Sequence, residues 1–322
     1  MLKRLLLLAL FTGLLAFLIP YGTQRFRTDP AEPAFSLQSA LPEDPAPPEE
    51  TYADDLMVNV WFPEEDTVKP IPLESLLPGV VAAEMPLSYE PDALKAQAIA
   101  ARSYIVSRMG DRSHQNGADL CTDSRHCLAW READPQNDAA AFDAAEATRG
   151  QVLTYEDSVA QTVFHALSGN RTESAAELWG EEIPYLRSLP SAGDAEQEDF
   201  ETTAAFSPEE YWACVSSLSP DPSAAPLVVL RRSEGGSVLS CTVGGVETTG
   251  EVLRSLLGLR SARFWLSYQE DTLCFKVQGY GHGVGMSQSG AQSMALEGSE
   301  YAEILLTYYP GCQLCRMVVS SR

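Results

Sequence analysis

The sequence predicts an α+β fold, and three observations support this prediction. Apolar residues make up 45% of the 322 residues and charged residues 21%, which is typical of a globular chain with a substantial core. Helical patterns gather in two regions, at 73–109 and 289–308, with a shorter one near 139–148. Short runs rich in β-branched residues, many of them bounded by glycine or proline, predict antiparallel strands between these regions.

The chain is strongly acidic. It has 22 lysine and arginine residues against 45 aspartate and glutamate residues, which gives a formal net charge of −23. Such a field repels polyanions at long range, so nucleic acid is not expected as a partner. An anionic substrate would need a local cationic groove.

The N-terminus predicts export through a membrane. Lys3 and Arg4 precede an apolar run from Leu5 to Pro20 in which Thr12 is the one polar residue, and no small-x-small cleavage pattern follows the run. We expect residues 1–20 to be an uncleaved, single-pass membrane anchor with its N-terminus in the cytoplasm. A cleaved signal peptide is the first alternative, and like the anchor it places the rest of the chain outside the cytoplasm. A buried core helix is the second alternative.

Residues 21–55 predict an extended stalk. Prolines alternate with acidic side chains there, and too few apolar residues are present to form a packed core. The stalk would hold one globular domain, residues 56–322, away from the membrane. Within that domain, residues 194–226 are acidic and weakly patterned, so we expect a surface insertion.

The elements of the domain follow from local patterns. A buried helix is expected from Leu73 until Pro86 stops it, and the alanine-rich residues 92–104 predict a second, closely packed helix. A third helix is expected near 139–148. Strands are expected at 151–155, 159–165, 227–231, 237–243 and 272–278, and further helices at 289–296 and 301–308.

Glu84 is the first candidate for chemistry. It stands alone among apolar residues near the end of the first helix. Apolar surroundings disfavour the charged carboxylate and raise its pKa, which suits a general acid near neutral pH. The alternatives are a surface position at the helix end or an ion pair with Arg102.

The glycine-rich segment 279–285 is the second candidate. Its four glycines at alternate positions permit unusual backbone angles and close approach of a ligand or another strand. No Lys-Ser/Thr pair follows as in a nucleotide-binding loop. Ser287 also lacks the glycine that follows the serine in a nucleophile elbow, which argues against a serine hydrolase.

A third candidate is a possible metal site. His114, Cys121, His126 and Cys127 fall within 14 residues, and two thiolates with two imidazoles would complete a tetrahedral structural zinc site. Four protein ligands leave no open position, so the metal would brace the loop rather than catalyse. The alternative is a disulfide between the two cysteines, favoured by an oxidising exterior.

A CxxC pair lies near the C-terminus. Cys312 and Cys315 follow Pro310-Gly311, and nothing around them resembles a thioredoxin-like redox site. We expect a tail disulfide between them. The sequence does not indicate how the remaining cysteines pair.

Together these motifs resemble the stage II sporulation protein D family. Residues 80–86 (Val-Val-Ala-Ala-Glu-Met-Pro) with the alanine-rich 93–104 are similar to its opening signature. Residues 281–288 (Gly-His-Gly-Val-Gly-Met-Ser-Gln) are similar to its closing signature. Further similar blocks occur, in order, at 164–173, 179–188, 253–261 and 308–311, and the anchor and stalk also suit the family.

The resemblance implies a membrane-tethered lytic transglycosylase that faces the cell wall during engulfment of the forespore. Such an enzyme cleaves peptidoglycan glycan strands between N-acetylmuramic acid and N-acetylglucosamine, leaving 1,6-anhydro ends. Glu84 occupies the position of the catalytic glutamate. One acid suffices because the muramyl 6-hydroxyl replaces the water that a hydrolase would activate. The resemblance also implies a partner amidase that strips stem peptides first, and a membrane scaffold of the engulfment machinery.

The resemblance assigns the remaining site residues less directly. Arg102 is expected to fix Glu84 or a muramyl lactate carboxylate, and Tyr185 to stack on a sugar or bond near the scissile linkage. The other polar residues expected to line the glycan groove are His165, Ser168, His282, Ser287 and Gln288. For each of these seven residues a purely structural role is the alternative.

Two more points follow from the family resemblance. A zinc loop similar to the one formed by His114, Cys121, His126 and Cys127 occurs in some members and is absent from others. Relatives described as amidase enhancers bind the wall or a hydrolase without necessarily cutting glycan. A non-catalytic, amidase-enhancing wall-binding scaffold is therefore the alternative function.

Overall fold

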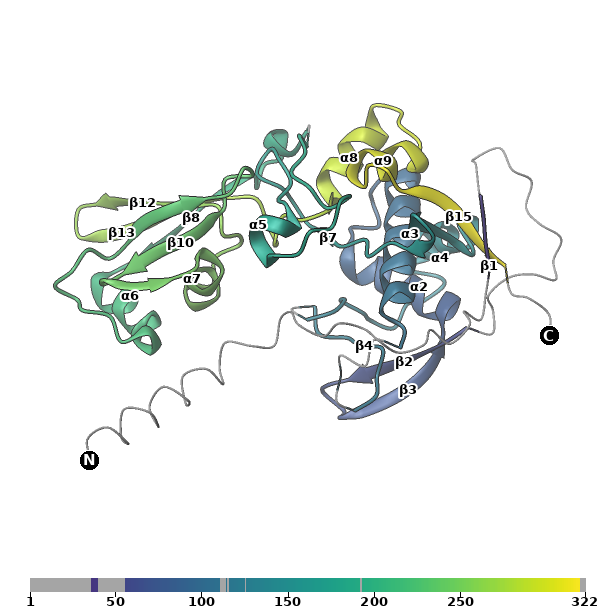
Figure 1. Cartoon of the computed structure of the whole chain (residues 1–322), viewed down its shortest axis with the longest axis horizontal. Coiled ribbons are helices and arrows are strands. Elements are labelled where there is room, and N and C mark those ends of the chain that lie inside the picture. Colours follow the sequence, from purple (N-terminus) through teal and green to yellow (C-terminus); the bar gives the residue numbers. More distant parts are fainter. Residues whose placement is uncertain are drawn as a thin grey trace, which may run out of the picture. The chain divides into compact units, whose positions relative to one another are not determined.

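The computed structural model describes residues 36–39, 56–110, 114, 116–124, 126–191 and 193–318 (Figure 1). These residues form a mixture of helices and short strands, which confirms the predicted α+β class. Within these ranges no helix combines the length and the apolar character needed to span a bilayer. The predicted anchor, residues 1–20, lies outside the described residues, as does most of the predicted stalk.

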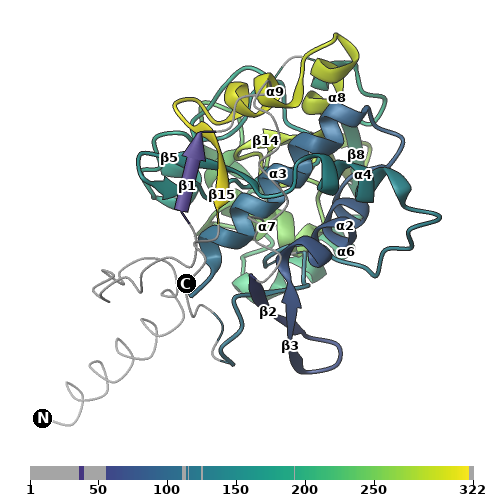
Figure 2. The same cartoon turned by 90° about the vertical axis from the view of Figure 1, so that its right-hand side faces the viewer.

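The larger hydrophobic core is built around helix α3 (Pro91–Arg108) (Figure 2). Its alanines are almost all fully buried, so neighbouring helices can approach its backbone closely. The expected alanine-rich helix is confirmed, four residues longer at its C-terminal end. The helices that pack with it are α2 (Leu73–Glu84), α4 (Ala139–Ala147), α8 (Gln288–Leu296) and α9 (Tyr301–Tyr308).

Three small sheets complete this part of the molecule. The first has the antiparallel order β1 (Ser36–Ser39), β15 (Gln313–Val318), β5 (Gln151–Tyr155), β6 (Ser158–Val159). The second has the order β3 (Thr67–Pro72), β2 (Met57–Phe62), β4 (Leu120–Cys121). In the third, β7 (Phe164–His165) runs parallel to β14 (Met286–Ser287). Four residues of the predicted stalk thus pair with the last strand of the body.

A second hydrophobic core lies within residues 201–278, which we call the small β region. One sheet has the order β11 (Val246–Thr248), β10 (Val238–Val243), β9 (Val228–Arg232). The other has the order β12 (Phe264–Gln269), β13 (Thr272–Gln278), β8 (Glu201–Phe206). Helices α6 (Pro208–Cys214) and α7 (Gly250–Leu257) pack with these strands, as Figure 1 shows.

Two expectations about elements need correction. Residues 194–226 are not a patternless surface insertion: they include the 3-10 helix η1 (Asp194–Glu196), strand β8, helix α6 and the 3-10 helix η2 (Ser216–Leu218). Asp194 is fully buried. The strand expected at 159–165 is two short strands, β6 and β7, because each end pairs with a different neighbour.

The glycine-rich segment 279–285 has the backbone that its sequence predicts. All four glycines have φ between +76° and +105°, a region that favours glycine. A side chain at Gly285 would overlap the backbone of Val163, and one at Gly281 would press on His165. The segment is therefore held tightly against the start of β7, and it leads directly into β14 and α8.

Candidate active site

Glu84 is the last residue of α2, where Met85 adopts an extended conformation and Pro86 follows. Its side chain is half-buried, and one carboxylate oxygen accepts a hydrogen bond of 2.6 Å from the backbone N–H of Ala129. Burial raises the pKa of Glu84 to about 7, although the Ala129 N–H and the Gln288 side chain both bond the carboxyl and oppose the rise. In the described part of the chain no ion pair joins Glu84 to a lysine or arginine. The group can therefore both give and accept a proton near neutral pH.

Two side-chain amides, those of Gln288 and Gln97, extend the hydrogen bonding from this carboxyl. Gln288, the first residue of α8, bonds Glu84 and also donates from Nε2 to Oε1 of Gln97 at 3.3 Å. Gln97 lies on α3 and is fully buried, and its own Nε2 has no hydrogen-bond partner among the described residues. Sequence analysis missed Gln97, although a single amide within a buried alanine-rich helix was a signal that could have found it.

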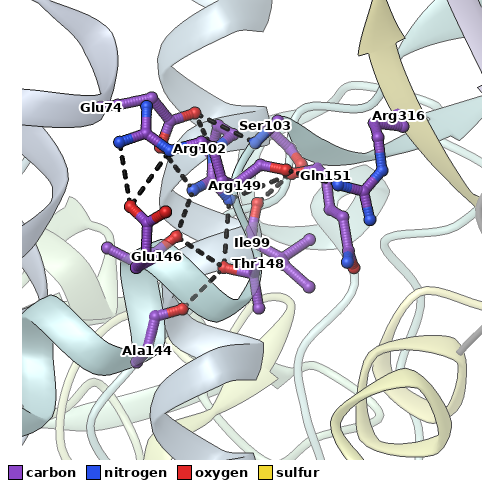
Figure 3. Close-up of polar contacts among 12 residues, drawn as sticks. Glu74, Ile99, Arg102, Ser103, Ala144, Glu146, Thr148, Arg149, Gln151 and Arg316 are labelled. Carbon is purple, nitrogen blue, oxygen red and sulfur yellow. Dashed lines mark hydrogen bonds and ion pairs between the residues drawn. The ribbon is translucent and has the colours of Figure 1, made fainter. Parts of the chain in front are cut away.

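Arg102 does not reach Glu84. Its guanidinium is fully buried and forms a bidentate ion pair with Glu74, with N–O distances of 2.9 and 2.7 Å (Figure 3). Its remaining N–H groups donate to Thr148 and to the backbone oxygens of Gln151 and Ala145. All five N–H groups are thus used inside the protein. The structural alternative holds for Arg102, with Glu74 rather than Glu84 as its partner, and no donor remains for substrate.

Tyr185 also lies in the core rather than in a groove. Its hydroxyl accepts a hydrogen bond of 2.8 Å from the backbone N–H of Gln161, and its ring packs 5.1 Å from that of Tyr155. Only 7% of the residue is exposed. This is the core tyrosine that was the alternative to sugar stacking.

His165 is buried next to the strand that leads to Gln288. Nδ1–H donates to the backbone oxygen of Val284 at 3.1 Å, which fixes the tautomer and leaves Nε2 as a lone-pair acceptor. That Nε2 has no hydrogen-bond partner among the described residues. Burial, and then the nearby His282, lower the pKa of His165 to about 3, so the ring stays neutral. His165 therefore has an unused acceptor and remains a candidate groove residue.

His282 is bonded to the backbone of two residues. Nδ1 accepts from the N–H of Val284 at 3.1 Å, and the ring also bonds the backbone of Phe164. Burial lowers its pKa to about 4. The ring packs between His165 and Trp179, with centroid distances of 5.8 and 5.4 Å. His282 thus fixes its neighbours by packing, which fits the structural alternative.

Ser168 and Ser287 meet at a buried carboxyl. Both hydroxyls donate to Asp194, Ser287 at 2.9 Å, and Ser287 also accepts from the N–H of Gly290 as the N-cap of α8. Burial raises the pKa of Asp194, and the serine hydroxyls oppose the rise. The two serines therefore fix α8, and with it Gln288, rather than facing a polyol substrate.

Residues 129–131 hold the Glu84 end of α2 and follow the His/Cys cluster, the name used below for His114, Cys121, His126 and Cys127. The N–H of Arg131 donates to the oxygen of Gly79 at 3.4 Å, and its side chain donates to the oxygen of Ala82 at 3.2 Å. A side chain at Gly79 would overlap Trp130 and the backbone of Arg131, so only glycine permits this approach. The Ala129 N–H that bonds Glu84 belongs to this same segment.

The four residues of the predicted metal site do come together. One ligand atom from each of His114, Cys121, His126 and Cys127 lies within 4.8 Å of the others. Three nitrogen–sulfur pairs lie 3.3 or 3.4 Å apart, a separation that fits tetrahedral two-nitrogen, two-sulfur coordination of one ion. The cysteines are free thiols, so the alternative disulfide is absent. Burial raises the pKa of the Cys127 thiol to about 12.

The tail disulfide is not formed. Cys312 lies in the turn before β15 and Cys315 within the strand, where its sulfur contacts the hydroxyl of Thr154 at 3.3 Å. Both residues are buried as free thiols. The strand backbone directs the second cysteine toward β5 rather than toward the first.

Comparison with known proteins bears on what this arrangement does. A family model described as "Stage II sporulation protein" matches residues 63–155, which include α2 and Glu84. Stage II sporulation protein D of Bacillus subtilis (strain 168) is 33% identical over 274 residues, which are 81% of this chain and 80% of the relative. The chain belongs to the stage II sporulation protein D family. The protein of the same name from Bacillus amyloliquefaciens is also 33% identical, over 80% of this chain and 78% of the relative.

The family relationship extends to a protein with a different name. An "Amidase enhancer" of Bacillus subtilis (strain 168) is 25% identical over 74% of this chain, but over only 40% of the relative. This member of the stage II sporulation protein D family is thus similar both to sporulation proteins and to an amidase enhancer. The resemblance stated from the motifs alone is confirmed.

Proposed function

We propose that this protein is a lytic transglycosylase that cleaves peptidoglycan glycan strands between N-acetylmuramic acid and N-acetylglucosamine. The observation that carries the proposal is Glu84, the last residue of helix α2. Its carboxyl is half-buried, has a pKa of about 7 and forms no ion pair with a lysine or arginine among the described residues. An acid of this kind is protonated in part at neutral pH and can act first as acid and then as base.

Glu84 performs both proton transfers of the proposed reaction. Its Oε–H protonates the glycosidic oxygen as the bond from that oxygen to the muramyl C1 breaks. The carboxylate so formed then takes the proton of the muramyl 6-hydroxyl as O6 bonds to C1. No water is consumed, and the product has a 1,6-anhydro end. The Ala129 N–H favours the carboxylate form between the two transfers.

Zinc is the ion we propose for the His/Cys cluster. Two thiolates and two imidazoles suit zinc, and four protein ligands leave it no position for substrate. The ion supplies structural bracing and takes no part in the chemical steps. Cys127 lies two residues before Ala129, so the braced loop leads directly into the segment that holds Glu84.

The location and partners belong to the same proposal. Residues 1–20 would anchor the protein in the cell membrane with its N-terminus in the cytoplasm, and the stalk would place the body against the cell wall. The substrate would be glycan stripped of stem peptides by a partner amidase, within the membrane-bound engulfment machinery. Similarity to an amidase enhancer supports one alternative, a non-catalytic scaffold that positions the amidase.

Product analysis separates the two functions. Full-length protein in detergent is incubated with peptidoglycan stripped of stem peptides, and the products are analysed by mass spectrometry. We expect anhydro-muramyl ends from the wild type and from Glu297→Gln, an exposed position at the end of α8. Glu84→Gln should lower the rate by about 10²–10⁴-fold, the range typical of general acid–base catalysis. Reducing ends, or no cleavage by folded wild type, would refute the transglycosylase and favour respectively a hydrolase or the scaffold.

A further inference from the structure

Two arginines of the small β region share one aromatic ring. The guanidinium of Arg232, at the end of β9, lies 4.8 Å from the ring centroid of Trp265 on β12. The guanidinium of Arg263, just before β12, lies 5.7 Å from the same centroid. Trp265 is 37% exposed, so the group is open to solvent. We call these three residues the Arg–Trp cluster.

Neutral acceptors hold both guanidinium groups in place. Arg232 donates to the backbone oxygens of Gly236 at 2.9 Å and Phe264 at 2.8 Å. Arg263 donates to the side-chain oxygen of Gln278 at 3.1 Å and to the backbone oxygen of Gly235. A guanidinium has five N–H groups, so these bonds leave most of the donors of each arginine unused.

The backbone is shaped around Arg263. A side chain at Gly169, in the loop after β7, would overlap Cδ and Nε of Arg263, and one at Gly236 would overlap Nη1 of its guanidinium. The Arg263 side chain therefore packs closely between two backbone segments, the loop at Gly169 and the turn at Gly236 after β9. Its charge is held at a fixed place rather than carried on a mobile side chain.

Among the described residues no carboxylate is bonded directly to either arginine of this pair. In the described part of the chain neither Arg232 nor Arg263 forms an ion pair, whereas arginines elsewhere in the same region do, such as Arg254 with Glu251. Burial, and then the charge of Arg263, lower the pKa of Arg232. Burial lowers the pKa of Arg263, and the charge of the nearby Glu173 opposes this shift. Glu173 itself accepts from the backbone N–H of Ser237 at 3.1 Å rather than from the arginine.

We propose that the Arg–Trp cluster is a binding subsite for an anionic group of a wall polymer. Two like charges fixed side by side, with unused donors and no ion pair among the described residues, form a local cationic site in a chain of net charge −23. Arg102 was expected to meet the lactate carboxylate of the substrate, but its donors are all used inside the core. The unused N–H groups of Arg232 and Arg263, in the small β region, are donors that can meet such a carboxylate instead.

The anion is a carboxylate or a phosphate, since a guanidinium binds both in the same bidentate manner. Glycan stripped of stem peptides carries one lactate carboxylate on each muramyl residue, and this choice of ligand rests on the proposed function. A wall polymer with phosphodiester groups, such as a teichoic acid, offers the same chemistry. Because charge attracts either anion to the subsite, we expect the affinity for both polymers to fall as the salt concentration rises.

Calorimetry on full-length protein in detergent tests the subsite. The Glu84→Gln background prevents turnover, and the probes are stripped glycan strands, the same strands with their carboxylates converted to methylamides, and purified teichoic acid. We expect at least one anionic probe to bind, with Arg232→Gln weakening that binding about tenfold through loss of charge-assisted hydrogen bonds. Arg232→Lys keeps the charge and should retain part of the affinity.

Lys276→Gln is the matched control. Lys276 lies on β13 in the same region, so the variant loses the same charge, but this lysine pairs with Glu201 at 2.7 Å. We expect it to bind as the parent does. The proposal is overturned if methylamide strands bind as tightly as carboxylate strands and teichoic acid does not bind. It is equally overturned if Lys276→Gln weakens binding as much as Arg232→Gln in variants with native circular dichroism.

The outcome separates the subsite from the proposed enzyme. Anhydro ends made by a protein whose affinity does not depend on Arg232 would leave the transglycosylase standing and refute the subsite. Arg232-dependent binding by a wild type that makes no anhydro ends would refute the enzyme and support the subsite. Binding of teichoic acid alone would assign the phosphate source. If Arg232→Gln fails to fold, salt dependence of wild-type binding decides, and salt-independent affinity overturns the proposal.

Discussion

The two ends of helix α2 carry the same residue type in opposite electrostatic settings. Glu74, in the first turn, has a 7% exposed side chain and is bonded by the buried Arg102 and by the N–H of Gly150 at 3.1 Å. Glu84, the last residue, is bonded by the N–H of Ala129 and an amide, without a cation. Ten residues correspond to about 1000° of helix rotation, so the two side chains leave the helix about 80° apart.

The difference explains how one helix can serve both the fold and the chemistry. The buried Glu74 on α2 and its bidentate partner Arg102 on α3 tie four elements together, because Arg102 also bonds residues from α4 and β5 (Figure 3). A half-buried carboxyl without a cation instead takes up a proton near neutral pH. The presence or absence of one cation thus separates a structural glutamate from a catalytic candidate.

The largest effect should come from breaking the Glu74 end. In Arg102→Ala, Glu74 remains buried without its cation, so we expect a loss of about 3–5 kcal/mol in the free energy of unfolding. Urea unfolding followed by circular dichroism measures this loss. Glu74→Leu combined with Arg102→Met removes both charges and should recover much of it. If Arg102→Ala unfolds at the wild-type urea concentration, the ion pair does not hold this end of α2.

Much of the fold could be predicted where the signal is local. Strand β13 and helix α9 have the bounds that their own residues predicted, since each is a compact patterned run. The small β region was missed as a separate core. Apart from Phe206, strand β8 consists of small and polar residues, and it becomes a strand because β13 lies beside it. Asp194 is buried because Ser168 and Ser287, distant in sequence, bond it.

The same division applies to the candidate site. Glu84 and the His/Cys cluster were found because an isolated acid and four clustered ligands are visible in a short stretch. The role of Arg102 could not be settled, since both Glu74 and Glu84 lie on the preceding helix. Which of them it meets depends on the face that α2 turns toward α3. The Arg–Trp cluster joins Arg232 at the end of β9 with Trp265 on β12 and Arg263 just before it, and only the folded sheets bring them together.

The second effect concerns the Glu84 end and depends on pH. The pKa of Glu84 is raised from 4.5 to about 7 in the folded protein, so the folded state binds more protons than the unfolded state between those values. Stability therefore falls as pH rises from about 4.5 to about 7 and then levels off. Glu84→Gln has no group that titrates in this range. Its free energy of unfolding should therefore exceed that of the wild type by about 3 kcal/mol above pH 7 and equal it near pH 4.

Urea unfolding at several pH values measures this difference, with Glu297→Gln as the control. The exposed control should run parallel to the wild type at every pH. A constant difference between Glu84→Gln and wild type would mean that Glu84 titrates normally. In that case the ionised Glu84 carboxylate would not lower the free energy of unfolding, and the lack of a cation would not distinguish this end of α2 from the Glu74 end.

Metal removal should loosen one end of α2 and spare the other. The Ala129 N–H that bonds Glu84 lies two residues after Cys127, whereas the Gly150 N–H that bonds Glu74 lies beyond α4. Zinc at a hundred times its dissociation constant adds about 2.7 kcal/mol, and a chelator should remove this. Hydrogen exchange compares the two amides under the same conditions. We expect chelation to accelerate exchange at Ala129 much more than at Gly150. Equal acceleration would mean that the cluster stabilises the whole core, and no change at either amide would mean that it binds no metal.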